Sequence, residues 1–122
     1  MMKILFTASI LGVLAAGSAY ADCPKPDSSV NIPSGASATK DEMIAAQRAL
    51  KAYDASVKSF GDCLQQEQAA KIAAAGDKAS KSDKDKINAE YAKRVNDEID
   101  KDQKLADKFN TELKAYKAKN TG

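Results

Sequence analysis

The chain has 122 residues, of which 30% are charged and 6% aromatic, and this length predicts a single domain. Nineteen basic and 17 acidic residues leave a net charge of only +2, and the two signs are interleaved, so no basic surface for nucleic acid or an anionic membrane is expected. The chain has no histidine, which removes the commonest general base and metal ligand.

The first 21 residues have the features of a cleaved secretory signal. Lys3 supplies a positive charge, residues 4–16 form a short apolar run, and Ala19-Tyr20-Ala21 is a small-x-small cleavage site. The apolar run is too short for a typical membrane-spanning helix. We therefore expect an exported mature chain that begins at Asp22 and has no membrane anchor. The periplasm is the expected destination, with the extracellular medium as the alternative.

Residues 22–38 are expected to form an extended arm. Three prolines in this stretch disfavour a helix and favour a polyproline-like backbone. Val30 and Ile32 are the only larger apolar residues of the arm. Because they are two positions apart, they point to the same side of an extended chain. The arm is therefore predicted to dock these two side chains into a groove.

A narrow apolar seam predicts the first helix, over about 39–75. Its members follow one another at spacings of three and four: Met43, Ala46, Leu50, Tyr53, Val57, Phe60 and Leu64. Thr39 and Glu42 form a capping-box pattern at its start, and Gly76 is a typical residue just past a helix end. Gly61 is unfavourable inside a helix, which predicts that another segment, such as the arm, approaches closely there.

A second apolar stripe predicts a helix over about 83–118, capped by Ser82 or Ser80. The stripe consists of Ile87, Tyr91, Val95, Ile99, Leu105, Phe109, Leu113 and Tyr116. Two helices of similar length joined by a short turn predict an all-α fold, a long, coiled-coil-like antiparallel hairpin over 39–122. Folding about the turn pairs Leu64 with Val95, Phe60 with Ile99, Tyr53 with Leu105, Leu50 with Phe109 and Met43 with Tyr116.

Cys23 and Cys63 are the two cysteines of the chain, and in an exported protein they predict one disulfide. Cys63 lies about 36 Å along the first helix from Thr39, at the helical rise per residue. The arm from Cys23 to Thr39 spans roughly 50 Å if extended. It can therefore run back along the hairpin and bond to the first helix.

The sequence lacks a phosphate-binding loop, a nucleophile elbow and a dinucleotide-binding motif, and the disulfide leaves no free thiol. We expect neither an enzyme nor a cofactor. An acidic cluster raises the question of a metal site: Asp97, Glu98, Asp100 and Asp102. Because Lys101 and Lys104 are interleaved with it and a helix spreads these positions over different faces, a solvated charged surface is the preferred interpretation, and no metal is expected.

Asp102 is unusual because helical spacing places it near the middle of the second apolar stripe. It is either a ligand or acid–base carboxylate in a groove, or a structural partner of Lys58 across the hairpin, and the second interpretation is preferred. Tyr53, Tyr91 and Tyr116 either line a groove or belong to the seam with the hydroxyl at its edge, again with the second preferred. Asp102, Lys58 and Tyr53 are the candidate groove residues.

The sequence resembles a family of small exported proteobacterial proteins with no known activity. The resemblance covers the mature chain up to Leu64, with a looser likeness around Phe109-Asn110. It is carried by Cys23-Pro24-x-Pro26, Ile32-Pro33-x-Gly35-Ala36, Thr39-x-x-Glu42-Met43 and Cys63-Leu64. It implies a helical hairpin in the periplasm, and no functional residues follow from it.

Three functions are considered. The leading hypothesis is a non-catalytic envelope protein that binds another protein or a peptide through the hairpin surface. The alternative is a periplasmic carrier of a small ligand or metal ion in the groove between the helices. An enzyme would need a carboxylate or tyrosine site that no motif indicates. Because two helices bury little apolar surface, a homodimer with a four-helix arrangement is considered beside a monomer.

Overall fold

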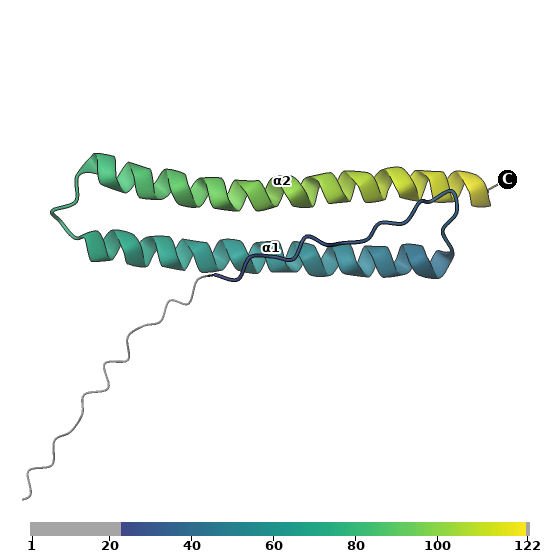
Figure 1. The fold of residues 1–122 in the computed structure, drawn as a ribbon, viewed down its shortest axis with the longest axis horizontal. Coiled ribbons are helices and arrows are strands. Elements are labelled where there is room, and N and C mark those ends of the chain that lie inside the picture. The colour runs from purple at the N-terminus through teal and green to yellow at the C-terminus, as the bar shows by residue number, and fades with distance from the viewer. Residues whose placement is uncertain (1–22, 122) are drawn as a thin grey trace, which may run out of the picture.

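The computed structural model describes residues 23–121, which contain two helices, α1 (Lys40–Ala75) and α2 (Lys81–Asn120). The helices lie side by side and antiparallel, joined by a short turn (Figure 1). The predicted all-α hairpin is therefore confirmed. The predicted signal and its cleavage site lie outside the described residues.

Helix α1 begins and ends as its capping residues predict. The backbone N–H of Glu42 donates to the Thr39 hydroxyl at 3.2 Å, and the Thr39 N–H donates to the Glu42 carboxylate at 2.7 Å. This reciprocal pair is the predicted capping box. At the other end Gly76 has a φ of 68°, a conformation that glycine adopts without a steric penalty.

Helix α2 begins two residues before the predicted start at 83. Ser80, rather than Ser82, is the N-cap, because Asp83 completes a second capping box with it. The Asp83 N–H donates to the Ser80 hydroxyl at 3.1 Å, and the Ser80 N–H donates to the Asp83 carboxylate at 3.3 Å. The helix continues to Asn120, two residues past the predicted end.

The arm before α1 runs back along the hairpin, from the end where α1 begins to a point past the middle of α1 (Figure 1). There Cys23 forms the predicted disulfide with Cys63 of α1, with 5.7 Å between the two Cα atoms. Ile32 is buried against Met43 and Phe109, and Val30 packs against the same cluster. The arm thus fills one of the two grooves between the helices, as its spacing predicts.

The predicted close approach at Gly61 is wrong, since a Cβ placed there would meet no atom of the described residues within 4 Å. The tight contact lies at Gly35, in the turn of the arm. A Cβ there would overlap the backbone carbonyl of Glu112 and crowd the backbone nitrogen of Tyr116 at 2.8 Å. The Gly35 N–H also donates to the Glu112 carboxylate at 3.1 Å. The arm can reach the end of α2 because it has no side chain at this position.

We expect Gly35→Ala to lower the free energy of unfolding by about 1–3 kcal/mol, because the new methyl group must displace backbone rather than a flexible side chain. Chemical unfolding monitored by circular dichroism measures the change. Ala36→Ser, at the exposed neighbouring position, is the matched control, with an expected change within about 0.5 kcal/mol. Equal stability of the two variants would contradict the close contact.

Three of the five predicted pairs, including Leu50 with Phe109, share an apolar cluster. Leu64 and Val95 belong to one apolar cluster, and Met43 and Tyr116 to the other. The predicted Phe60–Ile99 pair is wrong, because Ile99 is 38% exposed whereas Glu98 is 2% exposed. The spacings of four and three that start at Tyr91 place residue 98, not residue 99, in the seam.

Candidate functional site

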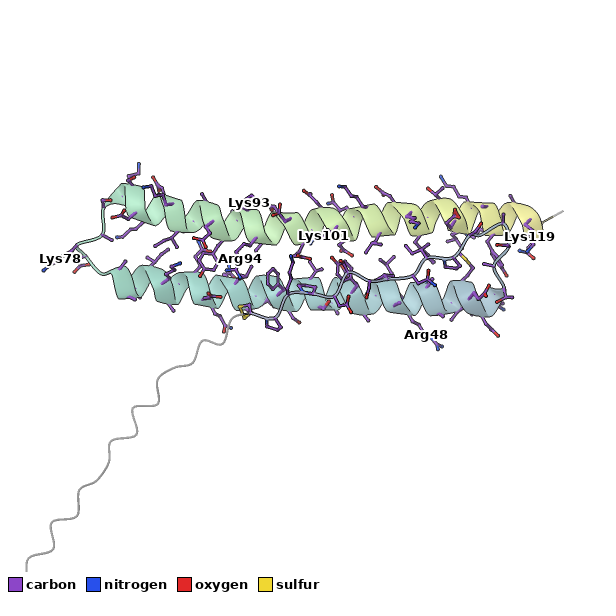
Figure 2. The ribbon with its side chains drawn as sticks, viewed as in Figure 1. Arg48, Lys78, Lys93, Arg94, Lys101 and Lys119 are labelled. Atoms are coloured by element: carbon purple, nitrogen blue, oxygen red, sulfur yellow. A yellow bond between two sulfur atoms is a disulfide. The ribbon has the colours of Figure 1, made fainter. Side chains whose placement is uncertain are left out.

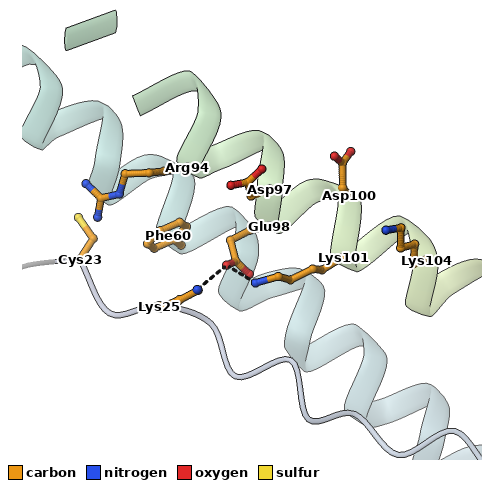
Figure 3. Close-up of a pocket in the computed structure, with 9 residues that line it drawn as sticks. All are labelled: Cys23, Lys25, Phe60, Arg94, Asp97, Glu98, Asp100, Lys101 and Lys104. Carbon is orange, nitrogen blue, oxygen red and sulfur yellow. Dashed lines mark hydrogen bonds and ion pairs between the residues drawn. The ribbon is translucent and has the colours of Figure 1, made fainter. Parts of the chain in front are cut away.

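One buried carboxylate connects all three parts of the fold. Glu98 of α2 accepts a hydrogen bond from the hydroxyl of Tyr53 in α1, with 3.2 Å between Oε2 and the phenol oxygen. Its other oxygen, Oε1, accepts from Nζ of Lys101 at 3.0 Å and lies 3.8 Å from Nζ of Lys25 in the arm. Figure 3 shows the two lysines converging on this oxygen. Glu98 therefore links α1, α2 and the arm.

The partners of Glu98 account for its burial. A carboxylate removed from water is costly unless it is paired and hydrogen-bonded, and both oxygens of Glu98 have partners. Burial, together with the negative charge of Glu98, raises the pKa of Tyr53 to about 12. The hydrogen bond to Glu98 raises the pKa of Lys101. Both donors therefore keep their protons at neutral pH, so the network is fully assembled there.

An open cavity of about 390 Å³ lies beside Glu98, and seven of its nine lining residues are charged (Figure 3). The four cations are Lys25, Arg94, Lys101 and Lys104, and the three carboxylates are Asp97, Glu98 and Asp100. The cavity lies between Cys23 and Lys25 of the arm, Phe60 of α1 and a face of α2 on which its charged residues recur every three or four positions. Figure 2 shows Lys93 pointing away from the hairpin, unlike its sequence neighbour Arg94.

Some of the charged residues in the cavity already form ion pairs, and others do not. Lys25 and Lys101 pair with Glu98, and Asp97 accepts from Lys93, outside the cavity, at 3.0 Å. Three cavity residues make no ion pair with any described residue: Arg94, Asp100 and Lys104. The guanidinium of Arg94 lies 5.3 Å from the centre of the Tyr91 ring, which positions it by a cation–π contact. The free charges can therefore pair with a bound molecule.

The Cys23 half of the disulfide lines this cavity. The Cys23 sulfur lies 3.4 Å from the carboxylate of Glu67, and the other oxygen of that carboxylate accepts from the Tyr91 hydroxyl at 3.0 Å. Burial and the hydrogen bond to Glu67 raise the pKa of Tyr91. Disulfides persist in oxidising compartments, so this bond indicates an exported environment.

The three predicted groove residues lie in three different environments in the structure. Tyr53 is buried on Glu98, and the charge of nearby Asp102 contributes to its raised pKa. Lys58 is exposed and makes no ion pair with any described residue, so the pairing of Lys58 with Asp102 is absent. Asp102 lies near Asp54 of α1 instead, and burial and this second carboxyl group raise its pKa. None of the three lines the charged cavity.

The pair of carboxyl groups gives a pH-dependent prediction. Because the pKa of Asp102 is raised above 3.8 in the folded state, folding binds protons and the group opposes stability above its folded pKa. Asp102→Asn is expected to raise the free energy of unfolding by on the order of 0.5 kcal/mol at pH 7. This gain should vanish as the pH falls toward 3.8. Thermal unfolding between these pH values measures it, with exposed Asp107→Asn as the control. A gain independent of pH would contradict the assignment.

Glu98 is the residue that sequence reasoning missed. Side-chain type alone favours its hydrophobic neighbour Ile99 for the seam. The signal that identifies Glu98 is the unbroken alternation of four and three along Tyr91, Val95, Glu98, Asp102, Leu105 and Phe109. The seam of α2 thus has two consecutive acidic positions, and each meets a polar partner in α1.

Among residues 23–121, no group of three or more histidine, cysteine or acidic side chains is arranged to hold a metal ion. Neither described helix contains a stretch that is long and apolar enough to cross a membrane. Comparison of the chain with protein-family models, curated proteins and solved structures finds no match. The candidate site is therefore defined by its geometry.

Proposed function

We propose that the protein is a non-catalytic, exported helical module that binds another protein or a peptide of the cell envelope, in the periplasm. The observation that carries this proposal is the charged cavity beside Glu98, in which Arg94, Asp100 and Lys104 have no intramolecular ion pair among the described residues. A bound segment that carries both a carboxylate and a cation would pair with these groups.

The construction of the cavity supports binding rather than chemistry. Its wall is fixed by the disulfide, by the arm and by the network on Glu98, so its charges are positioned before a partner arrives. Preorganised charges give specificity and raise the association rate. In the described part of the chain the cavity has no thiol, hydroxyl nucleophile or histidine that would form a nucleophile–base pair. The predicted signal and the family resemblance support the location.

Site-specific photo-crosslinking in the producing cell tests this function. A photoreactive residue at position 100 or 104 is expected to give one discrete adduct with an envelope protein. The same residue at position 48 should not, because Arg48 is exposed on α1 and points away from the hairpin (Figure 2). Arg94→Glu should abolish the adduct without unfolding the chain. No discrete adduct from the cavity positions, or equal adducts from position 48, would refute the proposal.

The volume of the cavity favours one alternative function, a carrier of a small charged ligand. About 390 Å³ lies within the range of small-molecule sites. Native mass spectrometry of protein recovered from the envelope fraction would then show an added mass that Arg94→Glu removes. Protein that is recovered without added mass, and whose melting temperature is unchanged by a panel of charged metabolites and metal ions, would exclude the carrier.

A further inference from the structure

The groove on the other side of the apolar seam, away from the arm, has almost no charge. It has a volume of about 510 Å³, and Asp62 is the one charged residue among the ten that line it. Its lining includes four carboxamides, Gln65 and Gln68 of α1 and Asn88 and Asn96 of α2, together with the small residues Gly61 and Ala92. We call these six residues and Ile99 the amide face. In a chain with 30% charged residues, a surface of this composition is unusual.

Gly61 on the amide face has no explanation within the described part of one chain. A glycine inside a helix costs about 1 kcal/mol relative to alanine. That cost is justified where a left-handed conformation or a close neighbour requires it. Gly61 has no positive φ, and a Cβ at this position would meet nothing within 4 Å. The space over Gly61 is therefore open for the close approach of a second molecule.

Ile99 extends the same face by one helical turn beyond Val95 and Asn96. At 38% exposure it is the one exposed large hydrophobic side chain among the described residues. Gly61 and Ile99 both lie near the middle of their helices. An open backbone, an exposed isoleucine and neutral polar groups thus coincide at the mid-length of the hairpin.

We propose that the amide face binds a second copy of this chain and forms a two-fold symmetric four-helix dimer. In a two-fold interface the same patch meets itself, so any excess of one charge is repelled by its own copy. A carboxamide both donates and accepts hydrogen bonds, so the four carboxamides can pair with those of a second copy, and Asp62 is the one charge that the groove brings to the contact. An axis perpendicular to the helices, through the middle of the amide face, places Gly61 and Ile99 of one copy against Gln68 and Asn88 of the other. The charged cavity remains free on the other side of each seam.

Sedimentation equilibrium of the purified, oxidised protein between about 1 and 100 μM tests the dimer. The wild-type chain is expected to have the mass of two chains at the upper concentrations. Gly61→Lys and Ile99→Lys are each expected to raise the dissociation constant at least about 100-fold, since a charge is then buried inside the contact. Lysine favours helix more than glycine does and fits the open space, so the folded chain tolerates Gly61→Lys.

Ala55→Lys is the matched control, because it adds the same charge at an exposed position of α1 outside the amide face. It should dimerise as the wild type does. Circular dichroism of all four proteins should show the same helix content. A wild-type chain that stays monomeric up to the highest concentration overturns the proposal and assigns the amide face to a different occupant. A dimer that both lysine variants retain at unchanged affinity also overturns it.

Discussion

Replacing both cysteines with serine is expected to lower the free energy of unfolding by about 4 kcal/mol, by the chain-entropy estimate for a loop of this length. The disulfide joins residues separated by 40 positions, so its loss restores a large conformational freedom to the unfolded chain. A domain of this size has a total stability of about 5–15 kcal/mol. The loss should therefore lower the melting temperature by roughly 15–30 °C.

Thermal unfolding of the Cys23→Ser/Cys63→Ser variant measures this loss. Wild-type protein in excess reductant is the internal control and should melt close to the double variant. A decrease of less than about 5 °C in both would contradict the estimate, because it would mean that the loop contributes little to the stability. A decrease in the variant alone would point to the substituted side chains rather than to the bond.

The disulfide and the apolar contacts of the arm should also be coupled. Ile32 is a core residue of the arm, so Ile32→Ala is expected to cost about 2–4 kcal/mol in the oxidised protein. Without the disulfide, the arm is held by fewer contacts and is already partly detached. The same substitution should then cost clearly less. Equal costs in the two backgrounds would show that the arm docks independently of its covalent anchor.

The hairpin and its arm were predictable because each follows from a strong local signal. The spacing of the seam from Met43 to Leu64, the capping residue Thr39 and the C-terminal Gly76 define α1 without reference to the rest of the fold. The disulfide follows from composition and chain length. Val30 and Ile32 predict docking because an extended segment has a fixed two-residue period.

The features that sequence reasoning missed depend on contacts between distant segments. Gly35 is required by the backbone of Glu112, 77 positions later, and no local pattern reveals such a neighbour. Gly61 is recognisable from the sequence as a glycine inside a helix, but this pattern does not identify the molecule that approaches it. Residue type also misled the assignment in α2, where Ile99 is more hydrophobic than Glu98 although the helical period selects Glu98. Glu98 takes the seam position because its carboxylate has a hydrogen-bond donor, Tyr53, across the hairpin.

The second large effect is expected at this buried carboxylate. Glu98→Leu keeps a side chain of similar size but leaves the hydroxyl of Tyr53, which is 3% exposed, without its acceptor. An unpaired buried hydroxyl costs about 1–3 kcal/mol. The ammonium groups of Lys25 and Lys101 lose their partner as well, although both can turn to water. Denaturant unfolding measures the loss, with Glu90→Leu, an exposed carboxylate of α2, as the control.

The double variant Tyr53→Phe/Glu98→Leu separates the hydrogen bond from the rest of the site. Replacing both partners of a buried pair with apolar groups of similar shape is often nearly neutral, so most of the loss caused by Glu98→Leu should be recovered. Losses that simply add would contradict a direct Tyr53–Glu98 interaction. If the double variant is stable but gives no crosslinked adduct from position 104, the carboxylate is needed for the charge pattern of the cavity. The cost of burying Glu98 would then reflect binding rather than folding.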